Sequence, residues 1–462
     1  MGAGKSTLGP ELAARLGRPF VSIDVLVEER AGTSVPDLFS SRGEAAFRLL
    51  EEQAAADVLD RRSLVVVELG GGALGSERTR AALRESALTV LLETTAAEAW
   101  ERIAGSDRPL ASDRGSFEAL FEERTPLYQQ AADARAHDVD GAVLAAAGVH
   151  VEDGSLARLA ELVPENAQIG LVTDETVARL YGEPVRSALG ERLASFHEVP
   201  AGEAAKSPVE AARLWSELRL DRLGTLVALG GGSTLDLSGF VAATYLRGLP
   251  WVPVPTTLVA QVDAAIGGKT GIDLPEGKNL VGGFHWPARV VVDSSTLQTL
   301  PPVELDNGLA EVVKTGLLAG EPLWEFETRE QVRRCAAFKA AVCLRDPFDR
   351  GERTQLNLGH TFAHALEAAS GFELPHGRAV ALGLLAALRI SGLEHEMHVV
   401  EDVLHPERAI VDPDAAWAAL GRDKKNVGGA PRLVLLEAPG RPLWGVAVAP
   451  ADVRSALDLL IA

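Results

Sequence analysis

The stretch TLVALGGGSTLDLSGF, Thr225 to Phe240, predicts a buried strand that turns directly into a helix. Its apolar run from Leu226 to Leu229 has the length of a strand, and a helical pattern begins just after the three glycines. Glycines at such a turn let a pyrophosphate approach the N-terminus of a helix. The triplet lacks the GxGxxG spacing, however, and a tight turn without a ligand explains it equally well. The stretch therefore predicts one unit of an α/β sheet and leaves its ligand open.

The chain on both sides of this stretch repeats the alternation of strand and helix. IGLVTDETVARLYG, residues 169–182, predicts a strand, a turn at Asp174 and a helix. Strands that alternate with helices predict a parallel sheet covered on both faces, and hence an α/β fold class. We expect an α/β domain at 1–140, a linker rich in alanine and glycine at 141–150, a second α/β domain at 151–295, and a mostly helical domain at 296–462.

The composition limits the partners and the compartment. The 462 residues include 65 acidic and 45 basic side chains, a net charge of −20, which argues against nucleic acid or an anionic membrane as the main partner. The two cysteines, Cys335 and Cys343, fit no metal or redox motif and predict buried thiols on one helix in a reducing compartment. A secretory pattern at the start and an apolar run of about 18 residues are both missing. We therefore expect a cytoplasmic protein.

A metal-binding pattern lies in RTQLNLGHTFAHALEAASGFELPHG, Arg353 to Gly377. His360 and His364 stand at i and i+4 and would share one face of a helix. Glycine and proline after residue 370 break that helix, which lets the chain bring His376 to the same point. A helix with a polar face explains the first two histidines alone. The third favours a metal, because two imidazoles from separate elements and one carboxylate form a zinc site with an open position.

The N-terminal sequence MGAGKSTLGPELAARLG, residues 1–17, has the second half of a phosphate-binding P-loop. In the full motif, GxxxxGK[ST], backbone N–H groups hold phosphates at a helix N-terminus, Lys5 would reach the outer phosphates, and Ser6 would bind Mg²⁺. The first glycine of the motif and the strand that feeds it would lie ahead of Met1. Asp24 and arginines near element ends suit an acceptor that carries hydroxyls and a carboxylate.

The order of GKST, VSIDVLVEE, GEAAFR, GGG, DRPL and RTPLY resembles the shikimate kinase family. The resemblance implies a P-loop kinase domain that phosphorylates shikimate with ATP and Mg²⁺. Ser22 stands where the family usually has an aspartate linked to Mg²⁺ through water, so an inactive nucleotide-binding or docking module is the alternative. The ATP-binding residues would be Gly2, Gly4, Lys5, Ser6 (also for Mg²⁺), Thr7 and Arg108, the last in a lid. The shikimate-binding residues would be Asp24, Arg48, Gly71, Gly72 and Arg124.

A second group of motifs resembles the 3-dehydroquinate synthase family over most of residues 165–440; it comprises GGGSTLDLSGF, PTTLVAQVDAAIGGKTGID, GKNLVGGFHWP, DNGLAEVVKTG, NLGHTFAH and LPHG. The resemblance implies a Rossmann-like NAD domain, a helical C-terminal domain, and Zn²⁺ or Co²⁺ in the cleft between them. The metal ligands would be Glu311, His360 and His376. The catalytic residues would be His364, Lys269, Lys314, Arg353 and Asn357, with Arg353 and Asn357 on one helix face. The NAD-binding residues would be Asp174, Glu203, Lys206, Gly231, Gly232, Asp236, Thr256 and Thr257. The substrate-binding residues would be Asp263, Lys278, Asn279, Lys339, Lys424, Lys425 and Arg247, the last reaching a neighbouring subunit.

The reaction implied by this second resemblance converts 3-deoxy-arabino-heptulosonate 7-phosphate to 3-dehydroquinate and phosphate. It combines transient oxidation by NAD, metal-assisted elimination and an aldol closure. A cluster of lysines and arginines in an acidic protein suits this polyanionic substrate. The alternatives are another sugar-phosphate cyclase or a metal-dependent alcohol dehydrogenase, and a plain alcohol dehydrogenase needs no phosphate grip. We expect two enzymes in one chain, small-molecule substrates, and a homodimer formed through the synthase part.

Overall fold

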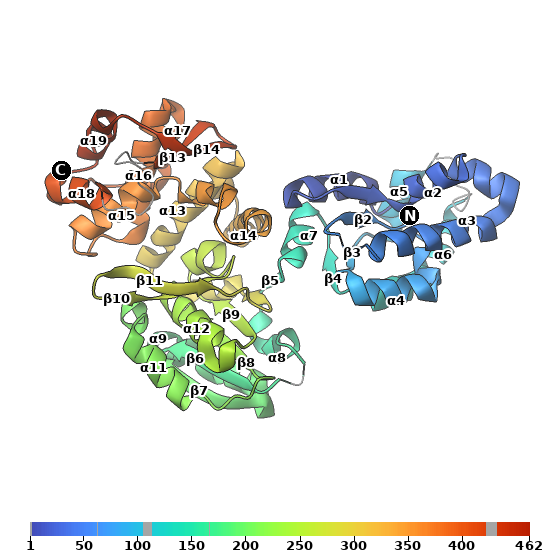
Figure 1. Cartoon of the computed structure of the whole chain (residues 1–462), viewed down its shortest axis with the longest axis horizontal. Coiled ribbons are helices and arrows are strands. Elements are labelled where there is room, and N and C mark those ends of the chain that lie inside the picture. Colours follow the sequence, from blue (N-terminus) through green and yellow to red (C-terminus); the bar gives the residue numbers. More distant parts are fainter. Residues whose placement is uncertain (1, 62, 105–112, 166, 422–431) are drawn as a thin grey trace. The chain divides into compact units, whose positions relative to one another are not determined.

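The computed structural model describes residues 2–61, 63–104, 113–165, 167–421 and 432–462, and Figure 1 labels its elements. The chain divides into two compact units, Met1–Ala147 and Gly148–Ala462. The boundary between the units falls inside the segment 141–150 that was predicted as a linker, and this segment contains most of helix α7 (Val139–Ala146) and the start of strand β5 (Val149–Val151). Alanine is the strongest helix former, so a stretch rich in alanine is a poor sign of a linker.

Unit 1 contains two pairs of parallel strands among its described residues. Parallel pairs need long crossover connections, which agrees with the predicted alternation of strands and helices. Apolar side chains of α2 and α3 form part of its core. The strands are β1 (Phe20–Ser22) paired with β2 (Val66–Glu68), and β3 (Val90–Leu92) paired with β4 (Ala134–Ala136). The helices are α1 (Lys5–Leu16), α2 (Ile23–Ala31), α3 (Val35–Leu59), α4 (Glu77–Ser86), α5 (Ala96–Ile103), α6 (Arg114–Ala131) and α7.

Four strands of unit 2 form a parallel sheet in the order β7-β6-β8-β9. Every residue of β6, β8 and β9 is buried, which explains their nearly continuous apolar runs. Helix α12 (Gly232–Thr244) begins just after β8 and packs against β8 and β9, so the predicted strand–glycine–helix unit and the α/β class are confirmed. The strands are β6 (Ile169–Asp174), β7 (Leu193–Val199), β8 (Thr225–Gly230) and β9 (Trp251–Pro255).

Other strands and short helices of unit 2 complete the part that precedes residue 300. Strands β10 (Lys269–Leu274) and β11 (Gly277–Phe284) form an antiparallel hairpin, and β5 pairs in parallel with β12 (Val290–Val292). The hairpin carries a Gly-rich sequence that includes Lys269 and Lys278. The helices before it are α8 (Leu159–Leu162), α9 (Glu175–Val177), α10 (Glu183–Leu189) and α11 (Pro208–Glu217).

The chain from residue 302 onward is mostly helical, as predicted. Its core is formed by apolar side chains of α13, α15 and α16, including Leu317, Phe362 and Leu388. Cys335 and Cys343 lie together on α14 and are buried and free, which confirms the expectation for both thiols. The elements are α13 (Pro302–Ala319), α14 (Thr328–Arg345), α15 (His360–Ala369), α16 (His376–Ser391), α17 (Glu394–Leu404), α18 (Pro413–Gly421), the antiparallel strands β13 (Arg432–Ala438) and β14 (Arg441–Ala447), and α19 (Pro450–Asp458).

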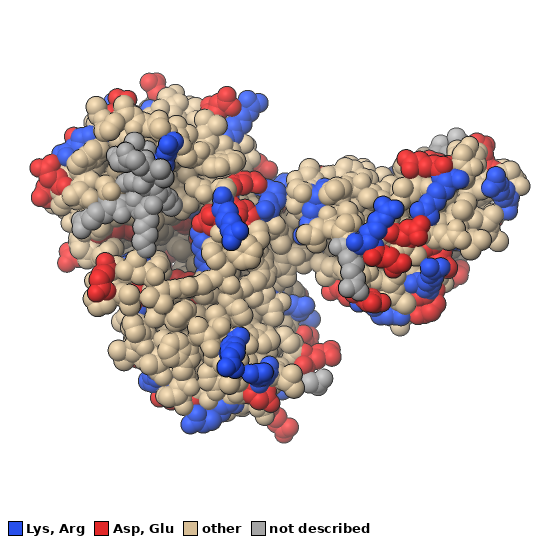
Figure 2. All heavy atoms as spheres, viewed as in Figure 1, with Lys and Arg blue, Asp and Glu red and all other residues tan. Residues whose placement is uncertain are grey.

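The surface of each unit carries charges of both signs. Figure 2 shows lysine and arginine side chains interspersed with aspartate and glutamate on the visible face. Within the described ranges, no helix combines the length and the apolar character that crossing a membrane requires.

Candidate active sites

Three side chains of metal-ligand type, each from a different helix, meet in unit 2. Glu311 lies on α13, and His360 and His376 are the first residues of α15 and α16. One donor atom of each lies within 4.8 Å of the other two. The Nε2 atoms of His376 and His360 lie 3.0 Å and 3.4 Å from Oε1 of Glu311. This donor set suits Zn²⁺ or Co²⁺ with positions left for a substrate. The predicted ligands therefore converge, and their role as ligands stays a prediction.

The local backbone explains how both histidines reach Glu311. Gly359 precedes α15 with a φ of 77°, a left-handed conformation that glycine adopts without strain. Gly377 follows His376 and packs on α13 so closely that a Cβ there would lie 2.4 Å from Cα of Asn307. The Gly377 N–H also donates to Oδ1 of Asn307 at 2.9 Å. Helix α16 therefore starts directly against α13.

Two lysines and an aspartate lie next to the metal-ligand cluster. The Lys314 ammonium, on a side chain that is 2% exposed, lies against Oε2 of Glu311 and 3.9 Å from Oδ1 of Asp263. Lys339 lies 2.8 Å from the same Asp263 carboxylate and donates to the Asp263 backbone carbonyl. Burial disfavours the charged form of Glu311, but Lys314 and His360 outweigh it and hold the pKa of the carboxyl well below its usual range. Glu311 is therefore the anionic member of the metal-ligand cluster, with Oε1 directed at both histidines.

The His376 ring has a carboxylate partner at each nitrogen. Its Nδ1 lies 3.0 Å from Oε1 of Glu367, and its Nε2 faces Glu311. Burial lowers the pKa of the His376 imidazole, but hydrogen bonds to Glu311 and Glu367 outweigh burial and raise it to about 10. Glu367 was not predicted, although a carboxylate seven positions after His360 on one helix was a usable signal. Carboxylates in this position orient metal-binding histidines.

His364 lies on the same helix as His360, as predicted, with ring centroids 5.5 Å apart. The prediction that Arg353 and Asn357 share one helix face is wrong. Both residues lie on a separate 3-10 helix, η10 (Glu352–Asn357), in which i and i+3 align rather than i and i+4. Arg353 is 2% exposed, and its guanidinium carbon lies 5.7 Å from the ring centroid of Phe284 at the end of β11.

The β10–β11 hairpin carries lysines that were predicted to hold an anion. Lys269 donates to Oδ2 of Asp349 at 2.5 Å, and Lys278 lies 4.7 Å from the ring centroid of Phe372. Phe372 belongs to the loop between α15 and α16, so the hairpin lies beside the loop that leads to His376. The lysine side chains are 52% and 39% exposed, which leaves both accessible to a dissolved anion.

The glycine turn lies at the carboxyl end of the parallel sheet. Gly231 is the N-cap of α12, and a Cβ at this position would lie 3.1 Å from Cγ2 of Thr257. The Thr256 N–H donates to the Gly230 carbonyl at 3.0 Å. Asp174 ends β6, and its Oδ2 accepts a hydrogen bond from Oγ1 of Thr234 at 3.3 Å. This turn, with Gly232 as the first helical residue, fits the close approach of a pyrophosphate.

A buried lysine connects the glycine turn to the hairpin. Lys206 is 5% exposed and donates to Oδ2 of Asp236 at 2.9 Å and to Oδ1 of Asn279 at 2.6 Å. Glu203 lies 3.6 Å from the same ammonium and accepts a hydrogen bond from Ser233 at 2.8 Å. Burial lowers the pKa of Lys206, but Asp236 and Glu203 outweigh burial and raise it. Three of the predicted NAD-binding side chains, Lys206, Asp236 and Glu203, therefore form one network beside the turn.

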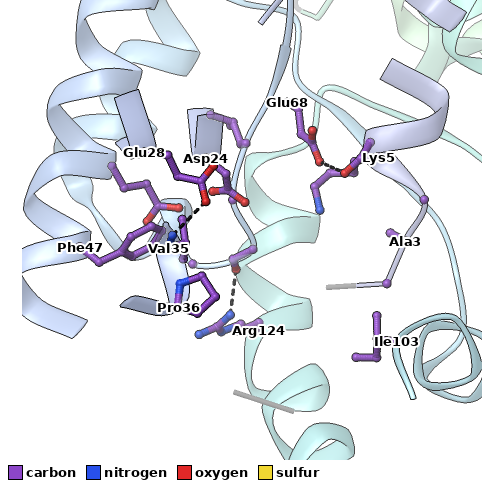
Figure 3. A pocket seen from close by; sticks show the side chains of 18 of the residues that line it. Ala3, Lys5, Asp24, Glu28, Val35, Pro36, Phe47, Glu68, Ile103 and Arg124 are labelled. Atoms are coloured by element: carbon purple, nitrogen blue, oxygen red, sulfur yellow. Dashed lines mark hydrogen bonds between the residues drawn. The ribbon is translucent and has the colours of Figure 1, made fainter. Parts of the chain in front are cut away.

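One pocket of unit 1 brings together every predicted ATP-binding or shikimate-binding residue that the structure describes (Figure 3). Gly4, with a φ of 85°, is the N-cap of α1, and Lys5 and Ser6 open the helix. Figure 3 shows Lys5 on one side of the pocket and Asp24 and Arg124 on another. The predicted residues that line it are Gly2, Gly4, Lys5, Ser6, Thr7, Asp24, Arg48, Gly71, Gly72 and Arg124.

Three carboxylates of this pocket, Glu28, Glu51 and Glu68, were not predicted. Glu51 is 1% exposed and accepts a hydrogen bond from Nη1 of Arg48 at 2.6 Å. Burial raises the pKa of the Glu51 carboxyl, and Arg48 offsets this only in part. Glu68 ends β2 and accepts a hydrogen bond from Oγ of Ser6 at 2.7 Å. The helical spacing of Arg48 and Glu51 was a usable signal, whereas Ser6 and Glu68 are 62 positions apart.

Three predicted residues, Arg108, Lys424 and Lys425, lie outside the described residues. Arg247 is described: it ends the short 3-10 helix η6 (Tyr245–Arg247), is exposed, and has a φ of 70°.

The fold and the sites define a two-part enzyme. One part is a P-loop unit with an acceptor pocket, and the other combines a parallel sheet of nucleotide-binding type with a cluster of metal ligands. The family profile described as shikimate kinase matches residues 1–147. The profiles for the N-terminal and C-terminal parts of 3-dehydroquinate synthase match residues 196–307 and 308–426.

Comparisons with known proteins agree with the profiles. The 3-dehydroquinate synthase of Symbiobacterium thermophilum is 43% identical over 347 residues, which cover 68% of this chain and 97% of the relative. That of Latilactobacillus sakei is 38% identical over 325 residues, covering 64% and 90%. The 2-epi-5-epi-valiolone synthase of Streptomyces hygroscopicus, solved with NAD⁺ and Zn²⁺, is 26% identical with a TM-score of 0.58, covering 68% and 96%. A 2-deoxy-scyllo-inosose synthase, solved with carbaglucose-6-phosphate, NAD⁺ and Co²⁺, is 23% identical with a TM-score of 0.62, covering 67% and 95%, and it shows the shared fold.

The chain belongs to the 3-dehydroquinate synthase family and carries a shikimate kinase domain in its N-terminal part. The predicted fusion of two enzymes of the shikimate pathway is therefore confirmed.

Proposed function

We propose that unit 2 converts 3-deoxy-arabino-heptulosonate 7-phosphate to 3-dehydroquinate and phosphate, and that unit 1 transfers the γ-phosphoryl group of ATP to the 3-hydroxyl of shikimate. The observation that carries the first activity is the convergence of Glu311, His360 and His376 next to a loop that contacts the lysine-bearing hairpin. An enzyme that acts on a phosphate-bearing polyol in this way needs both a metal site and a site that binds the phosphate anion. A plain alcohol dehydrogenase needs only the metal site.

The metal-ligand cluster would hold Zn²⁺ or Co²⁺, and the chemistry that a bound ion supplies there is polarisation of substrate hydroxyl oxygens. Lys314 balances the charge of Glu311 and Asp263 behind the cluster, so the carboxylates stay ionised. His364 stands one helical turn from His360 and would exchange a proton with a substrate oxygen. The valiolone synthase, solved with NAD⁺ and Zn²⁺, supports this pair of cofactors.

The turn between β8 and α12 would hold the pyrophosphate of NAD⁺, and bound NAD⁺ supplies reversible hydride transfer. Asp174, Glu203, Lys206, Asp236, Thr256 and Thr257 surround this turn and would bind the rest of the dinucleotide. Asn279, which accepts the Lys206 hydrogen bond, connects this network to the hairpin.

Basic side chains on the hairpin and the adjoining helices would hold the substrate. Lys269 and Lys278 are exposed enough to meet the phosphate, and a compact ammonium suits a phosphate oxygen. Buried Arg353 would pair with the substrate carboxylate through its planar guanidinium. Lys339 and Asp263, which already form an ion pair, would bind hydroxyls, as would Asn279 and Asn357.

In unit 1, the P-loop would hold ATP, with Ser6 on Mg²⁺ and Lys5 on the outer phosphates. Asp24 would accept from the attacking hydroxyl of shikimate. Arg48 and Arg124, which line the same pocket, would hold the shikimate carboxylate.

Two separate assays on the full chain test the proposals. The first follows phosphate release from the heptulosonate phosphate, with and without NAD⁺ and with and without a chelator. Phosphate release that requires NAD⁺ and is abolished by the chelator supports the synthase. Phosphate release or alcohol oxidation that is unchanged in the hairpin variant K269M/K278M contradicts it. The second follows ADP formation from ATP with and without shikimate. ADP formation that shikimate does not stimulate would identify unit 1 as a docking module.

We also infer a cytoplasmic homodimer that binds small molecules only. The exposed Arg247, held in a left-handed conformation at the end of η6, would reach the phosphate site of a second copy. Mixing R247A with R353A tests this, because a hybrid dimer would regain one intact site. Activity that does not rise on mixing would contradict the shared site, and light scattering measures the oligomeric state independently.

A further inference from the structure

The carboxylate of Glu68 lies at the phosphate loop of unit 1. Glu68 is the last residue of β2 and pairs in register with Ser22, the last residue of the neighbouring strand β1. Its Oε1 accepts a hydrogen bond from Oγ of Ser6 at 2.7 Å. Figure 3 shows the Glu68 carboxylate directed at the start of the helix that carries Lys5.

The direction of this hydrogen bond matters for a cation. The Ser6 hydroxyl has one proton, which it gives to Glu68, and two lone pairs, which stay available to a metal. The negative charge of Glu68 adds to the attraction for a cation at that oxygen. In P-loop enzymes generally, Mg²⁺ is held between the P-loop hydroxyl and an acid from a neighbouring strand.

Two other carboxylates of the pocket, Glu51 and Glu28, have partners elsewhere. Glu51 bonds to Arg48, and Glu28 accepts from the Val35 N–H at 2.9 Å. Among the described residues, Glu68 is the carboxylate for which the structure shows a hydrogen bond to the P-loop hydroxyl.

We infer that Glu68 is a positioning residue for Mg²⁺·nucleotide in unit 1: it orients the Ser6 hydroxyl and places a negative charge beside the metal. Ser22 offers no charge at the paired position on β1, so the acidic group comes from β2 instead. The inference deepens the proposed kinase function and rests on it, and it concerns metal binding, which is measured without phosphoryl transfer.

The experiment titrates Mn²⁺ into the full chain with saturating ADP and follows free Mn²⁺ by electron paramagnetic resonance. We expect E68Q to weaken Mn²⁺ affinity by about 10- to 100-fold, the range typical of groups that hold a metal ligand in place. E93Q is the matched control, because it removes an equal charge from the same unit. Glu93 follows β3 and pairs with Arg135. We expect E93Q to change Mn²⁺ affinity less than about twofold.

A second variant separates the charge of Glu68 from its shape. S22D/E68Q places a carboxylate on the paired position of β1 and should regain part of the lost Mn²⁺ affinity. E68D, which keeps the charge on a shorter side chain, should fall between wild type and E68Q and serves if E68Q does not fold. The circular dichroism spectrum and synthase activity check that each variant is intact.

Wild-type Mn²⁺ affinity in E68Q, an equal loss in E93Q, or a double variant no better than E68Q would each overturn the inference. The proposed kinase activity fails separately: a chain that binds Mn²⁺·ADP through Glu68 but never phosphorylates shikimate refutes the kinase and leaves this inference standing. Normal phosphorylation of shikimate together with Mn²⁺ affinity that is unchanged in E68Q supports the kinase and refutes this inference.

Discussion

The Nε2 atom of His376 lies 3.0 Å from Oε1 of Glu311, although 65 positions separate the two residues. A carboxylate and an imidazole at this distance, with the His360 ring beside them, share the space that one cation would fill. The close packing of α13 and α16 at Gly377 supports this arrangement.

Replacement of Glu311 should remove the metal. We expect E311Q to weaken Zn²⁺ affinity by at least about 100-fold and to abolish phosphate release, because the neutral amide brings no negative charge to the cation. Inductively coupled plasma mass spectrometry of the gel-filtered protein measures the metal. D306N, an exposed charge change on the same helix, is the control and should keep full occupancy. Stoichiometric zinc in E311Q would contradict the site.

Glu367 should act through His376. We expect E367Q to lower metal affinity by about 10- to 100-fold, because the Nδ1–H of the ring loses its charged acceptor and no longer fixes which nitrogen faces the metal. The matched control is E373Q, an exposed glutamate between the same two helices. Co²⁺ absorption spectra of both variants provide the readout. If E367Q and E373Q gave the same spectrum and affinity, Glu367 would have no positioning role.

Much of this architecture was predictable because its signals are local. The run from Leu226 to Leu229 and the glycines after it correctly indicated a buried strand and a helix start, since burial on both faces requires an apolar run. The helical spacing of His360 and His364 was also correct. Arg353 and Asn357 were misplaced because Gly359 separates two kinds of helix, and four-residue spacing has a different meaning in each.

The unpredicted residues depend on contacts between distant segments. Glu68 contacts Ser6 only because β2 pairs with β1 and packs against α1. No spacing in the sequence reveals this packing. The boundary between the two units falls inside the predicted linker at 141–150, but the sequence analysis did not identify the helix α7 that occupies most of this segment. Asp138 caps α7 by accepting a hydrogen bond from the Gly141 N–H at 2.8 Å, and an aspartate at this position was a usable signal for a helix start.

The Lys206 ion pairs should stabilise unit 2 in a pH-dependent way. The pKa of Lys206 is raised above its ordinary value of 10.5, so its stabilisation is fully present below about pH 10.5 and is lost as pH rises through the folded-state pKa. K206M leaves the Asp236 charge without its partner and should cost about 3–5 kcal/mol, and K206M/D236N should cost less than K206M. Urea unfolding followed at pH 8 and pH 11 measures both effects. A double variant less stable than K206M would contradict the pairing.

Arg48 should affect shikimate and not ATP. Its guanidinium is held by buried Glu51 and lines the same pocket as the P-loop, so R48M removes one partner for the shikimate carboxylate. Loss of a charged hydrogen bond should raise the KM for shikimate by about 10- to 100-fold, while the KM for ATP changes less than about twofold. The variant should also be less stable by about 1–3 kcal/mol, because Glu51 then lies buried without its arginine. R78M is the control: Arg78 is 63% exposed, pairs loosely with Glu52, and should leave both KM values unchanged. An equal rise in both KM values for R48M would place Arg48 on the nucleotide instead.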